Sequence, residues 1–312
     1  MQIISWIIST LLQWYVWMPI VVVLMFLTWR NYRKIEDFTP VESVLLVLEI
    51  PRTNDKQELA AEQLFASLHG ILRDNKELRL SGGHQEHISF EIASVNGQIK
   101  FYVWVPKTLQ SFVEGQIYSQ YPTVQIHQAD EDYTEHERDH EVAYSTELTL
   151  TTDEFLPIRT FQNFEVDPLA GITGTLAKLE TTGEELWIQV LVRPIPDDWQ
   201  NAADRYINSI KNGRMFSLPG FGGSMQWLIG VLGALWQPPE QGANQSTAIE
   251  LSDRDKTRIS EAEKKATKLG YEVKIRLVYM GESQTNAKLR MQALVGTFKQ
   301  FNSTNLNGFR AT

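Results

Sequence analysis

The chain of 312 residues contains no cysteine, which removes a whole set of chemistries. Without thiols, the protein forms no disulfide bonds, has no cysteine nucleophile and cannot ligate zinc or an iron–sulfur cluster through sulfur. The pattern G-x-x-x-x-G-K-[ST] is also absent, so no phosphate-binding loop of the P-loop ATPases is encoded. The lack of cysteine fits a cytoplasmic environment, and the sequence offers no ATP site.

Charged side chains are absent from residues 3–29, a run of 27 positions. A helix needs about 20 mostly apolar residues to cross a membrane. The first positive charges follow directly after the run, at Arg30, Arg33 and Lys34. Because positive flanks stay in the cytoplasm, we expect residues 1–35 to form a single-pass anchor in the inner membrane, with Trp17 and Trp29 near its interfaces. The rest of the chain is then cytoplasmic, and membrane lipid is a predicted partner.

A cleaved signal peptide is the main alternative for this segment. Signal peptides begin with positive charge and carry an apolar stretch of about 7–15 residues. Here the first positive charge is Arg30 and the apolar run is longer, which favours an uncleaved anchor. Two arrangements stay open: the helix spans the whole run with a bend at Pro19, or residues 1–13 lie along the membrane surface.

The remainder of the chain is acidic. All 38 acidic residues follow Lys34, together with 26 basic residues, which gives this part a net charge of −12. Proteins that bind nucleic acid through its phosphates need clustered lysine and arginine. We therefore expect no direct binding to nucleic acid. A hydrophobic content of 43% is typical of a folded chain, and its length suffices for two domains.

Residues 41–133 predict a first βαββαβ unit. An apolar, β-branched run at 44–50 indicates a buried strand, and apolar residues at helical spacing follow it. Asn96 and Gly97 separate two alternating segments and predict a β-hairpin. A further helix after Pro106 and a last strand complete the ferredoxin-like order.

The second half, residues 143–312, repeats this order after an acidic linker at 134–142. Asp167 followed by Pro168 predicts the start of a helix, and an insertion at 194–270 interrupts the unit. No closing strand is recognised before the chain ends. We therefore expect an α+β fold: an N-terminal transmembrane helix followed by two ferredoxin-like (βαββαβ) units, the second with a long insertion and lacking its last strand. The open sheet edge would then be paired either by residues that follow Thr312 in a longer chain or by a partner.

The insertion contains a second apolar run, residues 225–236. Twelve residues are too few to span a bilayer, and they suit a buried helix or a segment lying at the membrane surface. The buried helix is the favoured reading. A second membrane contact would involve four large side chains: Trp227, Leu228, Leu232 and Trp236.

One string matches the zinc-protease pattern H-E-x-x-H, with His136 and His140 as the two potential ligands. It lies in a strongly acidic segment between the two units, which favours a solvated linker over a dry zinc site. His84 and His87 are interpreted as exposed loop histidines. We therefore expect no catalytic residue, no cofactor-binding residue and no metal ligand.

Several segments resemble the membrane-anchored N-terminal region that precedes the ATPase module in type IV secretion and conjugation-type proteins. Besides the anchor, they are residues 67–71, 88–92, 101–106, 113–122, 132–133 and 271–279. That region is uncharacterised and has no catalytic residues to transfer. The resemblance implies a part that anchors a motor and docks it to channel subunits, while the motor itself is absent here.

These observations together predict a non-enzymatic, membrane-tethered scaffold or docking module of a type IV secretion or DNA-transfer machine. Its expected partners are protein subunits of a membrane complex and further copies of itself. One alternative is the N-terminal fragment of a larger P-loop transport ATPase. Another, less favoured, is a membrane-bound zinc hydrolase that uses His136 and His140. No cofactor is expected.

Overall fold

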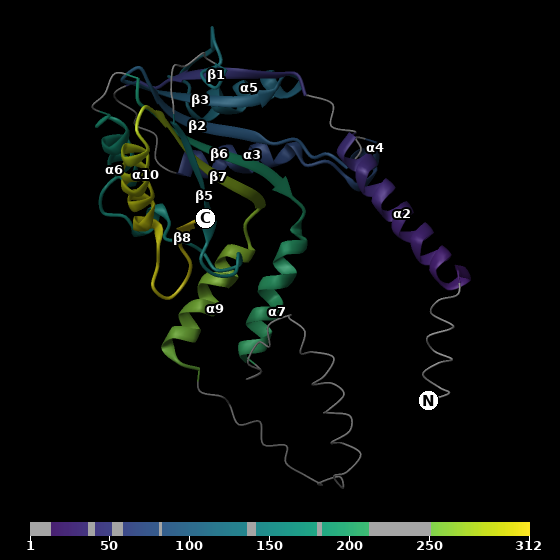
Figure 1. Ribbon diagram of the computed structural model, residues 1–312. Coiled ribbons are helices and arrows are strands. Elements are labelled where there is room, and N and C mark those ends of the chain that lie inside the picture. The colour runs from purple at the N-terminus through teal and green to yellow at the C-terminus, as the bar shows by residue number, and fades with distance from the viewer. Residues whose placement is uncertain are drawn as a thin grey trace.

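The computed structural model describes residues 14–36, 41–51, 59–80, 83–135, 142–179, 183–211 and 251–312. A long helix, α2 (Trp14–Glu36), precedes the first half of an α+β fold (Figure 1). The strands of this half are β1 (Ser43–Glu49), β2 (Ile88–Val95), β3 (Gln98–Pro106) and β4 (Gln125–Gln128). Its helices are α3 (Leu59–Leu68), α4 (Asn75–Leu80) and α5 (Gln110–Gln120), with 3-10 turns at His69–Ile71 and Lys107–Leu109.

The second half repeats the pattern of strand, helix, two strands, helix and strand. Its strands are β5 (Val142–Leu150), β6 (Glu185–Ile195), β7 (Gly270–Gly281) and β8 (Phe309–Ala311). Its helices are α6 (Pro168–Leu176), α7 (Gln200–Lys211), α9 (Asp253–Ala266) and α10 (Gln284–Phe298). Three 3-10 turns, Phe161–Asn163, Asp197–Trp199 and Lys299–Phe301, connect them.

Local signals in the sequence explain two of these boundaries. Asn96 and Gly97 join β2 to β3 with positive φ angles of 51° and 74°, as a two-residue hairpin turn requires. At the start of α6, the Asp167 carboxylate accepts a hydrogen bond from the backbone N–H of Leu169 at 2.8 Å, and Pro168 occupies the first helical position. The predicted hairpin and the predicted helix start are both confirmed.

The eight strands of the described residues form one antiparallel sheet with the order β4-β1-β3-β2-β6-β7-β5-β8. The two halves have the same order: β1 lies between β4 and β3, and β5 lies between β8 and β7. The second strand of each half, β2 or β6, lies next to the other half. The two inner strands, β2 and β6, pair from Ile88↔Val192 to Ser94↔Leu186. The edge of one half is therefore closed by the edge of the other, and the sheet is continuous across the junction.

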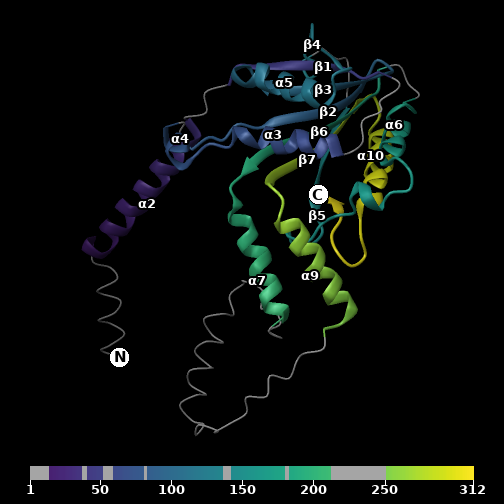
Figure 2. The same ribbon diagram turned by 180° about the vertical axis from the view of Figure 1, so that it is seen from behind.

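One face of the sheet, here called the covered face, is packed against helices. Under α3 and α5 the core includes Leu46, Val103 and Val113. Under α6 and α10 a second cluster includes Leu277 and Leu294. Val190 on β6 packs against both clusters, so the two helix pairs lie on the same side of the sheet. Figure 2 shows α6 and α10 side by side from behind.

The opposite face, here called the open face, buries a separate cluster. Its members come from five strands and from the segment after β4: Leu45, Val47, Ala93, Tyr102, Tyr133, Trp187 and Val278. Among the described residues, no helix contributes to this cluster. The loop that carries Tyr133 is therefore what shields the open face near the centre of the sheet.

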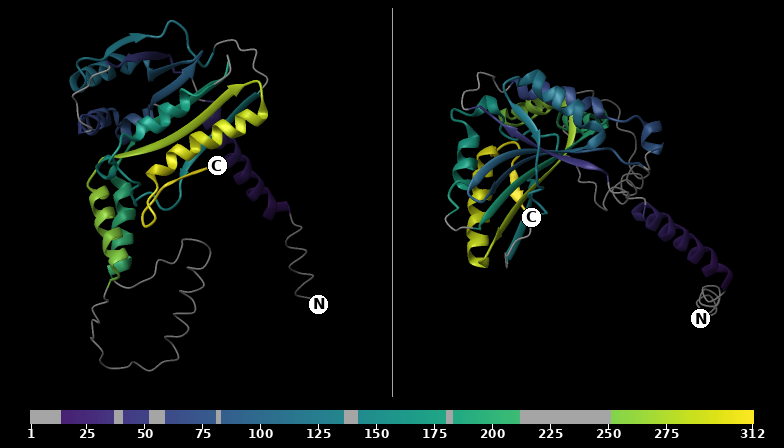
Figure 3. Two further views of the ribbon diagram at one scale, coloured as in Figure 1. Left: turned by 90° about the vertical axis from the view of Figure 1, so that its left-hand side faces the viewer. Right: turned by 90° about the horizontal axis from the view of Figure 1, so that it is seen from above.

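Helices α7 and α9 interrupt the second half and form a separate pair. Buried side chains of the two helices, among them Ile207 and Ile259, pack around Phe155 and Leu156. The pair projects away from the sheet at one end (Figure 3). The region predicted as an insertion thus contributes a small core of its own.

The predicted transmembrane anchor is wrong, and with it the single-pass localisation in the inner membrane. No helix in the described ranges is both long enough and apolar enough to cross a bilayer. The helix α2 has only 16 residues, Trp14 to Trp29, before its first charge, and about 20 are needed. The preceding part of the uncharged run, residues 3–13, lies outside the described residues.

The expected loss of the closing strand is also wrong. Strand β8 pairs with β5 through Leu150↔Phe309, Thr149↔Arg310 and Leu148↔Ala311. Asn307 fixes the segment that precedes β8. Its side-chain amide donates hydrogen bonds to the backbone oxygens of Asp153 and Leu156 at 2.8 and 3.0 Å. The strand has three residues, too few for an alternating pattern to be recognised.

Candidate functional site

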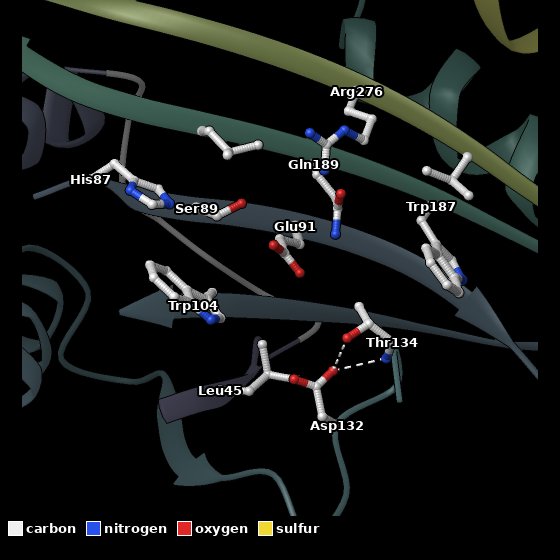
Figure 4. A pocket seen from close by; sticks show the side chains of 12 residues that line it. Leu45, His87, Ser89, Glu91, Trp104, Asp132, Thr134, Trp187, Gln189 and Arg276 are labelled. Atoms are coloured by element: carbon white, nitrogen blue, oxygen red, sulfur yellow. Dashed lines mark hydrogen bonds between the residues drawn. The ribbon is translucent and has the colours of Figure 1, made fainter. Parts of the chain in front are cut away.

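A pocket of about 360 Å³ lies on the open face, where the two halves of the sheet meet (Figure 4). Five adjacent strands and the segment after β4 supply its walls. Binding pockets for small groups range from about 300 to 1,000 Å³ and combine apolar walls with a few polar groups. The size and position of this pocket make it the leading candidate for a functional site.

Strand register brings the lining side chains together in two rows. In one row Leu45 pairs with Trp104, Trp104 with Ser89, and Ser89 with Leu191. In the next row Glu91 pairs with Gln189, and Gln189 with Arg276. Because side chains on a strand alternate between faces, both rows project to the open face. The pocket therefore depends on pairing between β2 and β6.

A buried carboxyl group occupies the middle of the pocket. Glu91 is 6% exposed, and the Tyr133 hydroxyl donates a hydrogen bond to its Oε2. The Gln189 amide donates in turn to the Tyr133 oxygen at 3.0 Å. Burial raises the pKa of Glu91 above its ordinary value, an effect that outweighs the opposing hydrogen bond from Tyr133. Buried carboxyls with raised pKa values concentrate at functional sites.

Aromatic side chains form opposite walls of the pocket. The ring of Trp104 stacks on that of His87, with centroids 4.7 Å apart and planes 15° from parallel. Burial has the largest effect in lowering the pKa of His87, and the nearby His84 and Arg193 lower it further. The indole of Trp187 donates to Glu185 Oε2 at 3.0 Å. Figure 4 shows Glu91 between the two tryptophans.

Two charged side chains flank the pocket from opposite sides. Asp132 accepts two hydrogen bonds on Oδ1, from the Thr134 backbone N–H at 2.8 Å and from its hydroxyl at 2.6 Å. Arg276 lies on the other side, with its Nε 3.8 Å from Glu147. Glu147 also contacts Lys274 at 2.9 Å. Both flanking charges thus have defined positions.

Ser89 carries a buried hydroxyl in the pocket lining, beside the Glu91 carboxyl. The residue is 3% exposed, and within the described part of the chain no group meets hydrogen-bond geometry with its hydroxyl. The hydroxyl lies close enough to Glu91 to lower the pKa of that carboxyl slightly. In Figure 4 it points into the pocket. Buried polar groups are satisfied in the great majority of cases, so this hydroxyl marks a position where a ligand atom fits.

The residues predicted to contact a membrane lie elsewhere. Trp17 and Trp29 are on α2, each 50% exposed, and the ring of Trp29 packs on Phe26. The positive charges predicted to set topology fall in the last turns of the same helix: Arg30, Arg33 and Lys34. The second predicted contact lies outside the described residues: Trp227, Leu228, Leu232 and Trp236.

The zinc-site hypothesis also concerns residues that the structure does not describe. His136 and His140 are outside the described residues, so the structure gives no geometry for them. In the described ranges, no three histidine, aspartate or glutamate side chains come together as metal ligands. His87, interpreted from sequence as an exposed loop residue, is instead half-buried against Trp104.

The sequence interpretation missed the pocket residues, although one signal was present. Ser89 and Glu91 occupy alternate positions of β2, and Trp187 and Gln189 alternate in the same way on β6. Alternation indicates a shared face, but it does not show that β2 and β6 are neighbours. A search for polar side chains at matched positions of inner strands would have grouped them.

The fold and the pocket define an α+β domain with a ligand-accessible sheet face. A sequence profile described as "Domain of unknown function (DUF8128)" matches residues 36–311, and the chain belongs to this family. No curated protein gives a significant sequence match. The resemblance to type IV secretion proteins is not addressed by these comparisons and stays a prediction.

Proposed function

We propose that this chain is a non-enzymatic docking module that binds a partner polypeptide through its open face. The observation that carries the proposal is the pocket at the junction of β2 and β6, with its apolar walls and its unsatisfied Ser89 hydroxyl. Half-open pockets with aromatic walls act as anchor points in protein interfaces, where a few buried side chains supply most of the binding energy.

The polar groups of the pocket favour binding over catalysis. Glu91, Tyr133 and Gln189 are joined by hydrogen bonds to one another. A nucleophilic mechanism needs a hydroxyl, thiol or amine hydrogen-bonded to a base. Ser89, a hydroxyl on the pocket's buried floor, lies near the Glu91 carboxyl but does not meet hydrogen-bond geometry with any described group. This arrangement supports recognition of a group placed between fixed side chains.

Panning a displayed library of random peptides on the full-length chain tests the proposal. Selected peptides are expected to lose at least about tenfold in affinity on Trp104→Ala, a loss typical of an aromatic anchor residue. Leu289→Ala is the matched control, because Leu289 is an apolar side chain on α10 that is 62% exposed. This variant should leave the affinity unchanged.

Two results would contradict the docking function. One is a failure of repeated selections to enrich any peptide that binds the chain in solution. The other is a set of peptides whose affinity is the same for the wild type and for Trp104→Ala. Far-ultraviolet circular dichroism and thermal unfolding of both variants confirm that an effect on binding does not reflect loss of the fold.

A further inference from the structure

The pocket has the features of a site for a positively charged group. Its carboxyl groups are the first of these features. Glu91 lies in the middle of the pocket and Asp132 at one side. The pKa of the Tyr102 hydroxyl is raised mainly by burial, and the nearby charges of Asp132 and Glu91 raise it further. Glu185 exerts the same effect and accepts a hydrogen bond from Trp187, but it is not part of the pocket lining. Two carboxyl groups, those of Glu91 and Asp132, thus line the pocket.

The aromatic walls add a second feature. A cation over the face of a tryptophan ring gains about 0.5–2 kcal/mol from the electron-rich ring, more when water is excluded. Trp104 stacks on His87 through one ring face, and both residues line the pocket. The lowered pKa of His87 keeps that imidazole uncharged near neutral pH, so it does not compete for the ring as a cation.

Arg276 is the one arginine or lysine among the described residues of the pocket lining, and it does not make the pocket favour a negatively charged ligand. Its guanidinium faces Glu147 on the neighbouring strand, and its side chain is 40% exposed. A negatively charged ligand would gain one partly solvated arginine and would face Glu91 and Asp132. A positively charged ligand would meet both carboxyls and the tryptophan ring, so charge complementarity favours the cation.

Apolar and polar contacts then define the rest of the ligand. Leu45, Leu191 and Val278 are apolar residues of the pocket lining and suit a hydrocarbon stem. The Ser89 hydroxyl, buried and without a partner in the described ranges, is placed to accept from a donor on the ligand. A stem that ends in several N–H donors matches this arrangement, and lysine and arginine both have that form.

We propose that the pocket binds the ammonium or guanidinium end of a lysine or arginine side chain on the docked polypeptide, held between Trp104 and the carboxylates of Glu91 and Asp132. This inference rests on the proposed docking function and specifies the residue that anchors the partner. The acidic balance of the whole chain, with a net charge of −9, assists the approach of a basic partner.

The test is a nuclear magnetic resonance titration of the full-length chain labelled at its tryptophan indoles, with Trp104 and Trp187 assigned from Phe variants. The probes are N-acetyl-arginine methylamide and its uncharged analogue with citrulline. N-acetyl-lysine methylamide and the norleucine analogue form a second matched pair. We expect the charged member of each pair to shift the Trp104 resonance at about tenfold lower concentration.

Asp132→Asn provides the matched variant. It removes one negative charge and keeps the Oδ1 acceptor that binds Thr134. Affinity for the arginine probe should fall several-fold, affinity for the citrulline probe should stay the same, and an unchanged indole spectrum shows that the fold is intact. Trp104→Leu, followed through the Trp187 resonance, should reduce the discrimination between the two probes.

The possible outcomes separate this inference from the docking function. If selected peptides bind at Trp104 but citrulline and arginine probes bind equally, the cation site is wrong and the docking function stands. Tighter binding of N-acetyl-glutamate methylamide than of the arginine probe would also overturn it, in favour of Arg276. If free agmatine binds and no peptide does, the pocket takes a small cation and the polypeptide partner is wrong.

Discussion

Leu45 and Leu46 are consecutive residues of β1, yet they face opposite sides of the sheet. Leu46 is fully buried on the covered face, among side chains of α3 and α5. Leu45 is 7% exposed on the open face and lines the pocket. The covered face is filled by apolar side chains from four helices. The open face leaves a cavity beside Leu45 and buries serine, glutamate and glutamine side chains there.

This difference separates the stability of the fold from its capacity to bind. Apolar packing on the covered face supplies the hydrophobic contribution, about 25 cal/mol for each Å² buried. The buried polar groups of the open face add little to stability and cost desolvation energy when they are not paired. Proteins retain such groups where function needs them. Substitutions at matched positions on the two faces should therefore have different effects.

The largest difference is expected between Leu46→Ala and Leu45→Ala. Leu46→Ala leaves an enclosed cavity and should lower the free energy of unfolding by about 3 kcal/mol. Leu45→Ala only widens an existing pocket, so we expect a loss of about 1.5 kcal/mol. Urea denaturation of the two variants measures both values. Equal losses would show that the open face is packed as tightly as the covered face.

Two buried glutamates give the second comparison. Glu184 is 4% exposed and accepts hydrogen bonds from Tyr279 at 2.8 Å and from Arg290 on α10 at 3.4 Å. Glu184→Gln removes the charge that faces Arg290 and should cost about 2 kcal/mol. Glu91 has no cation hydrogen-bonded to it among the described residues, so Glu91→Gln should stabilise the protein at neutral pH. A loss of stability in both variants would contradict this contrast.

The pH dependence of Glu91→Gln follows from the raised pKa of the carboxyl. A carboxyl with a higher pKa in the folded state binds more protons when folded, so stability falls as pH rises through that pKa. The wild type should therefore lose stability relative to Glu91→Gln as pH rises above the ordinary value of 4.5. Urea denaturation at pH 5 and pH 8 measures the difference. A constant difference between the two proteins would mean that the carboxyl is ionised at both values.

Local signals in the sequence predicted much of each half but not how the halves combine. Asn96-Gly97 and Asp167-Pro168 fixed a hairpin and a helix start because their conformational preferences act within a few residues. Pairing of β2 with β6 depends on contacts between residues about 100 positions apart, such as Ile88 and Val192. No local pattern reports such a contact, so the candidate site, which lies across it, was not foreseen.

The same limit applies to the polar positions of β2. Alternation in residues 88–92 predicts that Ser89 and Glu91 face outward, and on a bare sheet face they would be solvated. In the structure, Tyr133 folds over this face and binds Glu91. Burial of Glu91 is thus produced by a residue 42 positions away. Only the tertiary structure converts a solvent-facing pattern into a pocket.

The smallest expected effect concerns the two serines of β2, Ser94 and Ser89. Ser94 is 1% exposed, and its hydroxyl donates to the backbone oxygen of Leu176 in α6 at 3.3 Å. Ser94→Ala removes this bond on the covered face and should cost about 1 kcal/mol. Ser89→Ala removes a hydroxyl that has no partner in the described part of the chain, and should change stability by less than about 0.5 kcal/mol or increase it.

Binding and stability should respond in opposite ways to these two substitutions. Because a ligand would use the Ser89 hydroxyl, Ser89→Ala should weaken the arginine probe while leaving the fold intact. Ser94→Ala should lower the unfolding midpoint and leave binding unchanged, since its side chain lies on the other face. If Ser89→Ala destabilised the chain as much as Ser94→Ala, its hydroxyl would belong to the core, and the separation between a face for stability and a face for binding would fail.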